Sequence, residues 1–595
     1  MSLEQMHGMT LPPRDAFSPD MLAESKSIER WRAGAEGMVA YFSMEIAVAP
    51  NMPTYSGGLG VLAGDTLRAA ADCGLHLAAV TLVHRKGYFH QHLDSAGRQS
   101  EETEPWKPEE LLSHEEPVVA VSIEGRTVSV KAWRHDLAGV TGHSIPIYFL
   151  DTDIEGNDPA DRALTDSLYG SDGDYRLCQE IVLGMGGAQM LKALGYSPEV
   201  YHMNEGHAAL LAVALLEERI GPTSLAQTSE EAVAAVRQKC VFTTHTPVPA
   251  GHDRFSAEQA NRILGQERTT VLERLGCFHE KLLNMTYVAL RFARFVNGVA
   301  MQHGKVSRAM FPEYTINAIT NGVHANTWTS PAFKALFDRH VPGWRQDNQA
   351  LRYAIDISEA EISAAHAVAK RRLFDIVAER TGTALNPGIF TLGFARRVAT
   401  YKRADLLFTD GARLLRLAEK YGGLQILYAG KAHPKDEPGK ALIRNVFSEA
   451  GKLRSDKLRI VYLENYEWEL GALLTGGVDV WLNTPRRPYE ASGTSGMKAA
   501  LNGIPSLSIL DGWWIEGCIE GVTGWAIADR EEETGEAASL YEHLEDTILP
   551  TYYQRPVEWQ KIMRSTIAQN GAFFNTQRML QQYVIDAYFP EPLAQ

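Results

Sequence analysis

Short apolar runs alternate with longer amphipathic stretches along most of the chain, which predicts strands and helices in turn. In the first half, strands are predicted at Val39–Met44, Leu77–Val83, Val200–Met203 and Cys240–Thr244, with a strand-rich region at 118–150. In the second half, strands are predicted at 389–394, 424–429, 458–463, 478–482 and 506–510, and helices at 404–419 and 467–474. Such alternation is typical of parallel sheets covered on both faces. The predicted fold class is therefore α/β, with two Rossmann-like halves.

Two longer helices and an arm complete the expected elements. Residues 174–194 predict one helix, in which the small residues Gly184, Gly186 and Gly187 should allow close packing. The helix expected at 575–589 carries an apolar stripe made of Met579, Leu580, Tyr583, Val584, Ala587 and Tyr588. Residues 1–37 are polar, and we expect an extended arm with a short helix there.

Polar residues follow several predicted strands. The glycine turn Tyr55–Gly60 joins a strand to a helix, a layout in which the turn can approach an anion. Asn204, His207 and His245 come directly after two further strands. Polar side chains at the carboxyl ends of parallel strands face the ligand crevice of the sheet. A glycine cluster can also be an ordinary tight turn, so these residues alone leave a binding role open.

Composition narrows the class of protein. The 595 residues are too many for one core and predict two or three domains. The net charge of -15 and the pI near 5.7 argue against a nucleic-acid partner, which needs a basic face. Without a membrane-length apolar run or a signal-peptide pattern, we expect a cytoplasmic protein with no membrane association. The scattered cysteines predict free thiols: Cys73, Cys178, Cys240, Cys277 and Cys518.

No metal site is predicted. The histidines that could suggest one lack helical i,i+4 spacing and a supporting pattern of carboxylates; they are His202, His207, His245 and His252.

The stretch Tyr489–Gly503 carries the most specific candidate chemistry. Its segment Ser492–Gly496 suits a tight turn, after which Met497 begins an apolar helix. A turn that leads into a helix N-terminus exposes unpaired N–H groups and favours an anion. Lys498 follows at once, and an amine in apolar surroundings has a lowered pKa and attacks carbonyl groups more readily. These features suit a pyridoxal phosphate site, although an ordinary surface lysine fits the same residues.

A cationic segment, Arg396–Arg403, follows the strand predicted at 389–394. It holds four cations in eight residues. Arginine offers a planar fork and lysine a point charge, so the segment suits a small dianion. The alternative is a solvated, charged helix start.

Together, the motifs resemble those of the α-glucan (glycogen, starch, maltodextrin) phosphorylases. In order, they are Tyr55–Gly60, Asn204–His207, Thr244–Thr246, Thr320–Val323, Arg396–Arg403, Ala429–Ala432 and Tyr489–Gly503. The resemblance covers about residues 38–530. It implies the GT-B fold, in which two Rossmann-like domains face a central cleft. The implied domains are an N-terminal one at 1–320, a C-terminal one at 321–560 and a helix within 561–595 that packs back on the first domain.

The resemblance also implies roles for individual residues. Pyridoxal 5'-phosphate would be held as a Schiff base on Lys498. The other implied cofactor-binding residues are Gly57, Gly58, Trp328, Lys431, Tyr466 and Thr494. The implied catalytic residues are Lys498, His245 and the pair that grips the reacting phosphate, Arg397 and Lys402. Lys431, at the end of the next strand, would be a further cation near that phosphate. The implied glucose-binding residues are His245, Asn321, Glu490, Ser492 and Gly493.

The implied reaction is phosphorolysis of an α-1,4-glucan with retention, which yields α-D-glucose 1-phosphate. Inorganic phosphate, acting through the phosphate group of the cofactor, protonates the glycosidic oxygen, and it then attacks the oxocarbenium-like state. The sequence has no pair of acids in a recognisable glycosidase arrangement. Two dianions in contact repel each other, which explains why Arg397, Lys402 and the helix N-terminus near Thr494 would converge. A homodimer is expected only by analogy.

Some positions depart from the family pattern. Ala399 and Thr400 stand where the family has a histidine and an acidic residue, and Gly496 stands where many relatives have asparagine. These departures resemble the short bacterial and archaeal branch. The nucleotide and phosphorylation control sites of longer members have no counterpart, so allosteric regulation is not expected.

Two other functions remain open at this point. A GT-B nucleotide-sugar glucosyltransferase, similar to glycogen synthase, would share the fold but would need no cofactor lysine. A glucan-binding relative without catalysis would have no need of Lys498, Arg397, Lys402 and Glu490.

Overall fold

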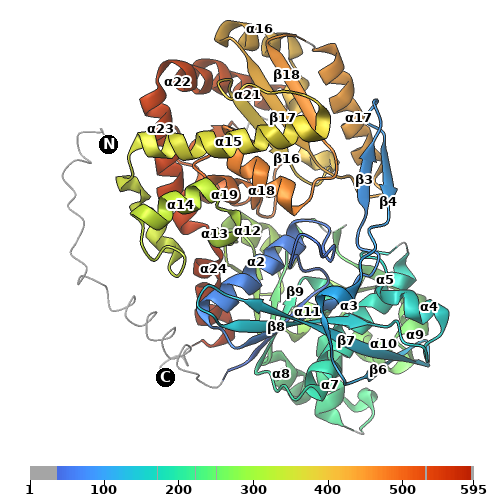
Figure 1. The fold of residues 1–595 in the computed structure, drawn as a ribbon. Helices are drawn as coiled ribbons and strands as arrows, with labels where there is room; N and C mark the ends of the chain where they lie inside the picture. The colour runs from blue at the N-terminus through green and yellow to red at the C-terminus, as the bar shows by residue number, and fades with distance from the viewer. Residues whose placement is uncertain are drawn as a thin grey trace.

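The structure, a computed structural model, describes residues 37–590 except 171, 222, 249–250, 454 and 529–532. The arm expected at 1–37 therefore lies outside the described residues, apart from its last position. The described chain is a mixed α/β protein with two large sheets that are mainly parallel, as predicted (Figure 1).

The larger sheet has the strand order β15-β14-β10-β9-β1-β2-β8-β7-β5, and β6 pairs with β7. Neighbours from β15 to β8 are parallel, whereas β7 is antiparallel to its partners. The parallel strands are β1 (Val39–Ser43), β2 (Leu77–Leu82), β8 (Ser144–Asp151), β9 (Val200–Asn204), β10 (Cys240–Thr243), β14 (Phe295–Gly298) and β15 (Asn317–Ala318). The others are β5 (Ser113–His114), β6 (Val119–Ile123) and β7 (Arg126–Ala138). The predicted strands of this half are confirmed, because strands buried on both faces read as apolar runs.

The second large sheet has the order β18-β17-β16-β19-β20-β21, with every neighbouring pair parallel. Its strands are β16 (Thr391–Ala395), β17 (Leu424–Ala429), β18 (Leu458–Leu463), β19 (Val480–Asn483), β20 (Ser506–Ile509) and β21 (Gly524–Ile527). The predicted strands of this half are confirmed within a few residues.

Helices cover both sheets. In the first half they are α2 (Gly58–Cys73), α3 (Pro108–Leu111), α4 (Pro159–Arg162), α5 (Gly173–Ile181), α6 (Gly187–Ala193), α7 (Leu211–Ile220), α8 (Glu230–Arg237), α9 (Ala257–Ile263), α10 (Gln266–Arg274), α11 (Met285–Phe292) and α12 (Met301–Met310). In the second half they are α13 (Ala325–Trp328), α14 (Pro331–His340), α15 (Glu359–Thr381), α16 (Gly411–Tyr421), α17 (Glu437–Lys452), α18 (Trp468–Gly477), α19 (Ser495–Ala500), α20 (Trp514–Gly517), α21 (Glu533–Glu542), α22 (Leu549–Gln554), α23 (Pro556–Thr566) and α24 (Thr576–Gln582).

The prediction of a helix at 404–419 was wrong about where the helix begins. Short 3₁₀ turns occupy Thr400–Lys402 and Leu406–Phe408, and α16 begins only at Gly411. The Asp410 side chain accepts a hydrogen bond from the Arg413 N–H at 2.8 Å. An N-cap of this kind satisfies a helix N–H group that has no partner within the helix, so it defines where the helix begins.

The helix predicted at 174–194 is interrupted by one π-helical turn, Val182–Gly186, between α5 and α6. Its glycines do allow close packing. A Cβ at Gly184 would lie 2.5 Å from the backbone nitrogen of Leu211, and a Cβ at Gly187 would lie 2.7 Å from the ring of Phe42. Such π-helical turns are rare and occur mostly as single turns inside α-helices.

The last helix packs against the larger sheet. Asn575 caps α24, which continues as a π-helical segment, η12 (Tyr583–Tyr588). The predicted apolar stripe is buried in one cluster with residues of β1, β2 and α2. Two hydroxyl groups also reach the sheet: Tyr588 bonds the His202 ring at 2.7 Å, and Tyr583 bonds Thr243 at 3.0 Å.

Two other elements bridge the halves. Figure 1 shows α2 between the two large sheets, and it shows the hairpin of β3 (His90–Leu93) and β4 (Gln99–Glu102) beside α17. A small sheet of β11 (Arg254–Ser256), β13 (Leu282–Asn284) and β12 (Phe278–His279) completes the fold. The five cysteines are free thiols, as predicted. In the described part of the chain, no helix combines the length and the apolar character that crossing a membrane requires.

Candidate active site

The glycine loop, Tyr55–Gly60, runs directly into α2, which begins at Gly58. A Cβ added at Gly57 or Gly58 would meet nothing within 4 Å, so the outer side of the loop is open. Two of its N–H groups, those of Ser56 and Gly57, donate to one carboxylate oxygen of Glu45 at 2.6 and 3.2 Å. The Tyr55 hydroxyl accepts a hydrogen bond from the backbone N–H of Trp468 at 3.0 Å. The loop is therefore held from both halves of the chain.

Lys498 lies on α19 in an almost fully enclosed position, with 7% of its surface exposed. Its Nζ atom is 3.4 Å from the centre of the Trp328 ring, a cation–π contact. Burial lowers the pKa of Lys498 to about 8, and the negative charge of Asp65 opposes that change. The indole N–H of Trp328 donates to Asp65 at 2.6 Å. The structure thus brings together two predicted residues, Lys498 and Trp328, and adds a third group, Asp65.

The cationic segment meets Glu490. One oxygen of Glu490 accepts hydrogen bonds from Arg396 Nη2 at 2.5 Å and from Lys402 Nζ at 2.6 Å. Burial would raise the pKa of Glu490, but the two cations lower it to about 2. Arg396 also has two buried nitrogen atoms, Nε and Nη1, without a hydrogen-bond partner among the described residues. A buried charged donor without an acceptor is costly, so these atoms suit an anionic ligand.

Two further predicted cations, Arg397 and Lys431, have neighbours that differ from those of Arg396 and Lys402. Arg397 is exposed at the surface; its guanidinium loses part of its hydration, which would lower its pKa, but the phenol groups of Tyr401 and Tyr88 raise the pKa above its ordinary value. Lys431 donates a hydrogen bond to the backbone oxygen of Phe89 at 2.9 Å, and burial lowers its pKa to about 8. Lys431 thus contacts Phe89, which precedes the hairpin, whereas Arg397 interacts with Tyr401 and Tyr88.

His245 lies beyond the end of β10. Its Nε2 is 2.7 Å from the side-chain oxygen of Asn204, so Nε2 carries the proton, because an amide oxygen can only accept. Burial lowers the pKa of His245 to about 4, which keeps the ring neutral near pH 7. Its backbone N–H donates to Glu205 at 2.7 Å. Glu205 has a φ of 73°, a strained conformation of the kind that clusters at functional sites.

Two predicted sugar ligands carry unsatisfied polar atoms. Asn321 Oδ1 and Ser492 Oγ are buried and lack a hydrogen-bond partner within the described residues. The backbone oxygen of Asn321 accepts from Arg578 at 2.9 Å, which holds the residue in place. The next residue after Ser492, Gly493, has a φ of 87°, a conformation that favours glycine. Ligand hydroxyls would satisfy such atoms.

The last two predicted cofactor residues are placed near these groups. Thr494 is the N-cap residue of α19, although its side chain makes no capping hydrogen bond. Tyr466 is half-buried; desolvation of its phenol raises the pKa of the group to about 12, and the nearby charge of Arg396 opposes that rise.

Three residues of the site were not singled out from the sequence: Asp65, Arg396 and Asn204. Arg396 and Asn204 lie inside recognised motifs, so their position after a strand was the available signal. Asp65 lies within an apolar helix start, where a charged residue could have been noticed as a candidate for burial. Among the described residues, no group of His, Cys, Asp and Glu side chains could hold a metal ion.

These features define a class of protein: an α/β protein that combines charged donors at strand ends with a buried amine of lowered pKa. Residues 252–524 match the family model described as carbohydrate phosphorylase. The chain is 38% identical to the maltodextrin phosphorylase of Thermococcus litoralis, over 98% of this chain and 73% of the relative. It is 37% identical to the glycogen phosphorylase of Mycobacterium tuberculosis, over 93% of this chain and 71% of that relative. It is 34% identical to that of Aquifex aeolicus, over 92% and 86%.

The chain therefore belongs to the carbohydrate phosphorylase family.

Proposed function

We propose that this chain is an α-1,4-glucan phosphorylase that requires pyridoxal 5'-phosphate. The observation that carries the proposal is the Lys498 amine, which is buried, has a lowered pKa and lies against the ring of Trp328. The relatives named maltodextrin phosphorylase and glycogen phosphorylase support the substrate class, an α-linked glucose polymer with inorganic phosphate.

We propose the GT-B arrangement for the domains, with an N-terminal domain at 1–320, a C-terminal domain at 321–560 and a returning segment at 561–595. Each of the first two spans contains one of the large parallel sheets. In such sheets, ligands bind beyond the carboxyl ends of the strands. His245 follows β10 in one sheet, and Arg396 follows β16 in the other.

The residues present fit the cofactor. Lys498 would hold its aldehyde carbon, Trp328 would cover its ring, and the two unpartnered nitrogens of Arg396 would donate hydrogen bonds to its phosphate. Tyr466 and Thr494 lie where they could add hydrogen bonds, and the open side of Gly57 and Gly58 leaves room for close approach. When bound, the cofactor supplies a phosphate group that exchanges a proton with the reacting phosphate.

The chain's own side chains bind and orient the substrates. Arg397 and Lys402 hold the inorganic phosphate by charge-assisted hydrogen bonds. The neutral His245 ring directs its Nε2 proton toward a sugar oxygen when the bond to Asn204 is exchanged. Asn321 and Ser492 offer their unsatisfied oxygen atoms to glucose hydroxyls. Burial of Lys402, Asn321 and Ser492 excludes water, which would otherwise compete with phosphate for the glucosyl carbon.

A phosphorolysis assay tests this proposal. The full chain, supplied with pyridoxal phosphate, is incubated with maltodextrin in the presence and absence of inorganic phosphate. We expect α-D-glucose 1-phosphate to form only with phosphate, and the protein to show the absorbance of bound pyridoxal phosphate. Glucose transfer from a nucleotide sugar, with no cofactor absorbance, would favour the glucosyltransferase instead.

A further inference from the structure

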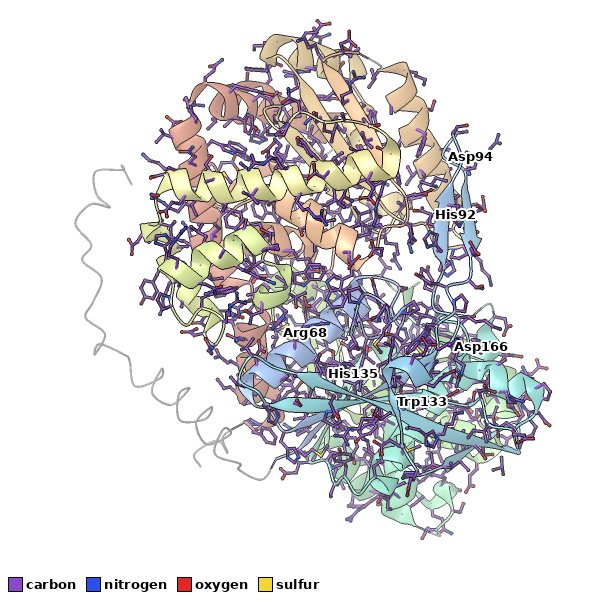
Figure 2. All side chains as sticks on the ribbon, viewed as in Figure 1. Arg68, His92, Asp94, Trp133, His135 and Asp166 are labelled. Atoms are coloured by element: carbon purple, nitrogen blue, oxygen red, sulfur yellow. The ribbon has the colours of Figure 1, made fainter. Side chains whose placement is uncertain are left out.

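One face of α2 is charged and yet buried. It carries Asp65, Arg68 and Asp72, spaced so that all three project from the same side of the helix. Arg68, labelled in Figure 2, lies on α2 at the junction of the two halves. Its guanidinium is 4.4 Å from the centre of the Trp468 ring and donates to the backbone oxygen of Val48 at 2.5 Å. Buried charges persist only where specific partners hold them.

The two acids bind the segment that leads into α13. Asp72 Oδ2 is 2.8 Å from the His324 ring and accepts from Asn326 at 3.2 Å. Asp65 Oδ2 accepts from the His324 backbone N–H at 3.1 Å and from the Trp328 indole N–H at 2.6 Å. Asp72 therefore holds the start of this segment, and Asp65 holds Trp328, whose ring lies against Lys498.

The other oxygen of Asp65 is unusual. Oδ1 is buried and has no hydrogen-bond partner in the described part of the chain. Its nearest cation by contact is Arg68 at 3.8 Å, and the Arg68 guanidinium is already occupied by backbone oxygens. Burying a carboxylate oxygen without a hydrogen-bond partner costs free energy of folding unless a nearby positive charge compensates it.

We propose that Asp65 is a positioning residue for the cofactor lysine: it fixes the Trp328 ring against the Lys498 amine and supplies the buried counter-charge of that amine. Since α2 begins at Gly58, the same carboxylate also sets the place of the glycine loop relative to the lysine. This inference rests on the proposed function and adds a residue that acts through Trp328 and through charge.

The surroundings of Lys498 support a specific role for Asp65. Other charged or titratable groups are present on the elements around α19; they are Arg68 and Asp72 on α2, His324 before α13, Glu467 and Glu469 at the start of α18, and Asp479 before β19. The charge of Asp65, and not that of any group in this list, raises the pKa of Lys498 against the effect of burial.

The test compares the full native chain with Asp65→Asn, each loaded with pyridoxal phosphate. One measurement follows the loss of cofactor absorbance after dilution. The other finds the pH at which the bound cofactor changes between its low-pH and high-pH absorbance forms. Removing a nearby negative charge destabilises a protonated amine nitrogen, so we expect this pH to fall by about one unit. We also expect cofactor loss to be about tenfold faster, because Trp328 loses a charged acceptor.

Asp161→Asn is the matched control, since it neutralises a buried acid that bonds Arg126 and not the segment that leads into α13. Its absorbance change and its rate of cofactor loss should match those of the native chain. Trp328→Phe is the second variant and decides the matter if Asp65→Asn does not fold. It keeps an aromatic ring but removes the N–H group that Asp65 holds, so cofactor loss should again be faster.

The outcomes separate the two claims. If the native chain takes up pyridoxal phosphate and Asp65→Asn keeps both the native pH of change and the native rate of loss, the role of Asp65 is wrong. A Trp328→Phe variant that retains the cofactor as long as the native chain overturns it as well. If the native chain takes up no pyridoxal phosphate, the proposed function falls first, and this inference falls with it.

Discussion

The carboxylate of Glu490 accepts a hydrogen bond from the Nζ atom of Lys402 at 2.6 Å. The same oxygen accepts from Arg396, so one acid joins the proposed sugar site to the proposed phosphate site. A carboxylate and a phosphate compete for the same donors. In the proposed reaction, phosphate would take Lys402 from Glu490, and Glu490 would then be able to accept from glucose hydroxyls.

Replacing Glu490 by glutamine tests this exchange. The amide carries no charge, so Lys402 should bind phosphate more readily, and we expect the KM for phosphate to fall about threefold or more. We expect kcat to fall about 100-fold, because hydrogen bonds to sugar hydroxyls strengthen in the transition state. Initial rates over a range of phosphate concentrations at saturating maltodextrin measure both. The control is Glu449→Gln, which alters a pair with Lys452 at the surface. A native KM together with a native kcat would contradict the exchange.

Removing the Lys498 amine should abolish the cofactor site. In Lys498→Ala we expect neither cofactor absorbance nor detectable turnover, because the covalent holding group is lost. Absorbance of the protein after gel filtration and release of glucose 1-phosphate are the two measurements. Lys452→Ala, which removes an amine with 65% of its side chain exposed, should behave as the native chain. Turnover retained by Lys498→Ala would refute the role of this lysine.

The stability of the larger sheet should depend on pH through His202. This ring is buried between Tyr588 and Thr243, and burial lowers its pKa to about 3. In the unfolded chain the pKa of histidine is about 6.5. As the pH falls from 6.5 towards 3, the unfolded chain takes up a proton that the folded chain does not, so stability is lost at up to about 1.4 kcal/mol per pH unit.

In His202→Asn the contribution of His202 to the loss of stability in acid disappears. The variant is instead less stable by about 1–3 kcal/mol at pH 7, because the hydrogen bonds of His202 are lost. The stability deficit of this variant relative to the native chain should therefore shrink between pH 6.5 and pH 5. Urea unfolding, followed by tryptophan fluorescence at several pH values, measures the deficit. Carboxylates such as Glu490 also titrate in acid, but they are common to both chains and cancel in the difference. A deficit that stays constant would show that His202 does not resist protonation.

The apolar pattern of the sequence was sufficient for most of the fold. Strands such as β1 and β17 are buried on both faces, so their apolar runs leave little ambiguity. The start of α16 was missed because one side chain, Asp410, ends a stretch of 3₁₀ turns by capping, and helical periodicity does not record that competition.

The partners within the site were less predictable. The family resemblance placed Lys498, Trp328 and Glu490 in one region, but it did not show that Glu490 would pair with Arg396. The acid that holds Trp328, Asp65, lies 263 residues earlier in the chain. Contacts over such separations depend on how the two halves dock, and no local pattern of residues encodes that docking.

The hairpin of β3 and β4 offers the last prediction. The side chain of Gln91 is buried and joins three segments: its Nε2 donates to the Gly430 oxygen at 2.9 Å and to Gln99 at 2.9 Å, and its oxygen accepts from the Asn465 N–H at 2.9 Å. Figure 2 shows His92 and Asp94 farther along the same hairpin, toward its tip. The backbone just before the hairpin also accepts from Lys431, a predicted cation of the phosphate site.

Gln91→Ala should therefore loosen the hairpin and alter the site together. Three hydrogen bonds are lost, and the Asn465 N–H loses its acceptor while the Gly430 oxygen keeps Tyr462, so we expect a loss of stability of about 2–4 kcal/mol. Hydrogen exchange should become faster in residues 88–102, and the KM for phosphate should rise, because Lys431 would no longer be held. The control is His92→Ala, which removes an exposed pair with Glu102 and a ring contact with His90 on the same hairpin. If exchange accelerates in Gln91→Ala while the KM for phosphate stays native, the hairpin stabilises the fold without positioning the phosphate site.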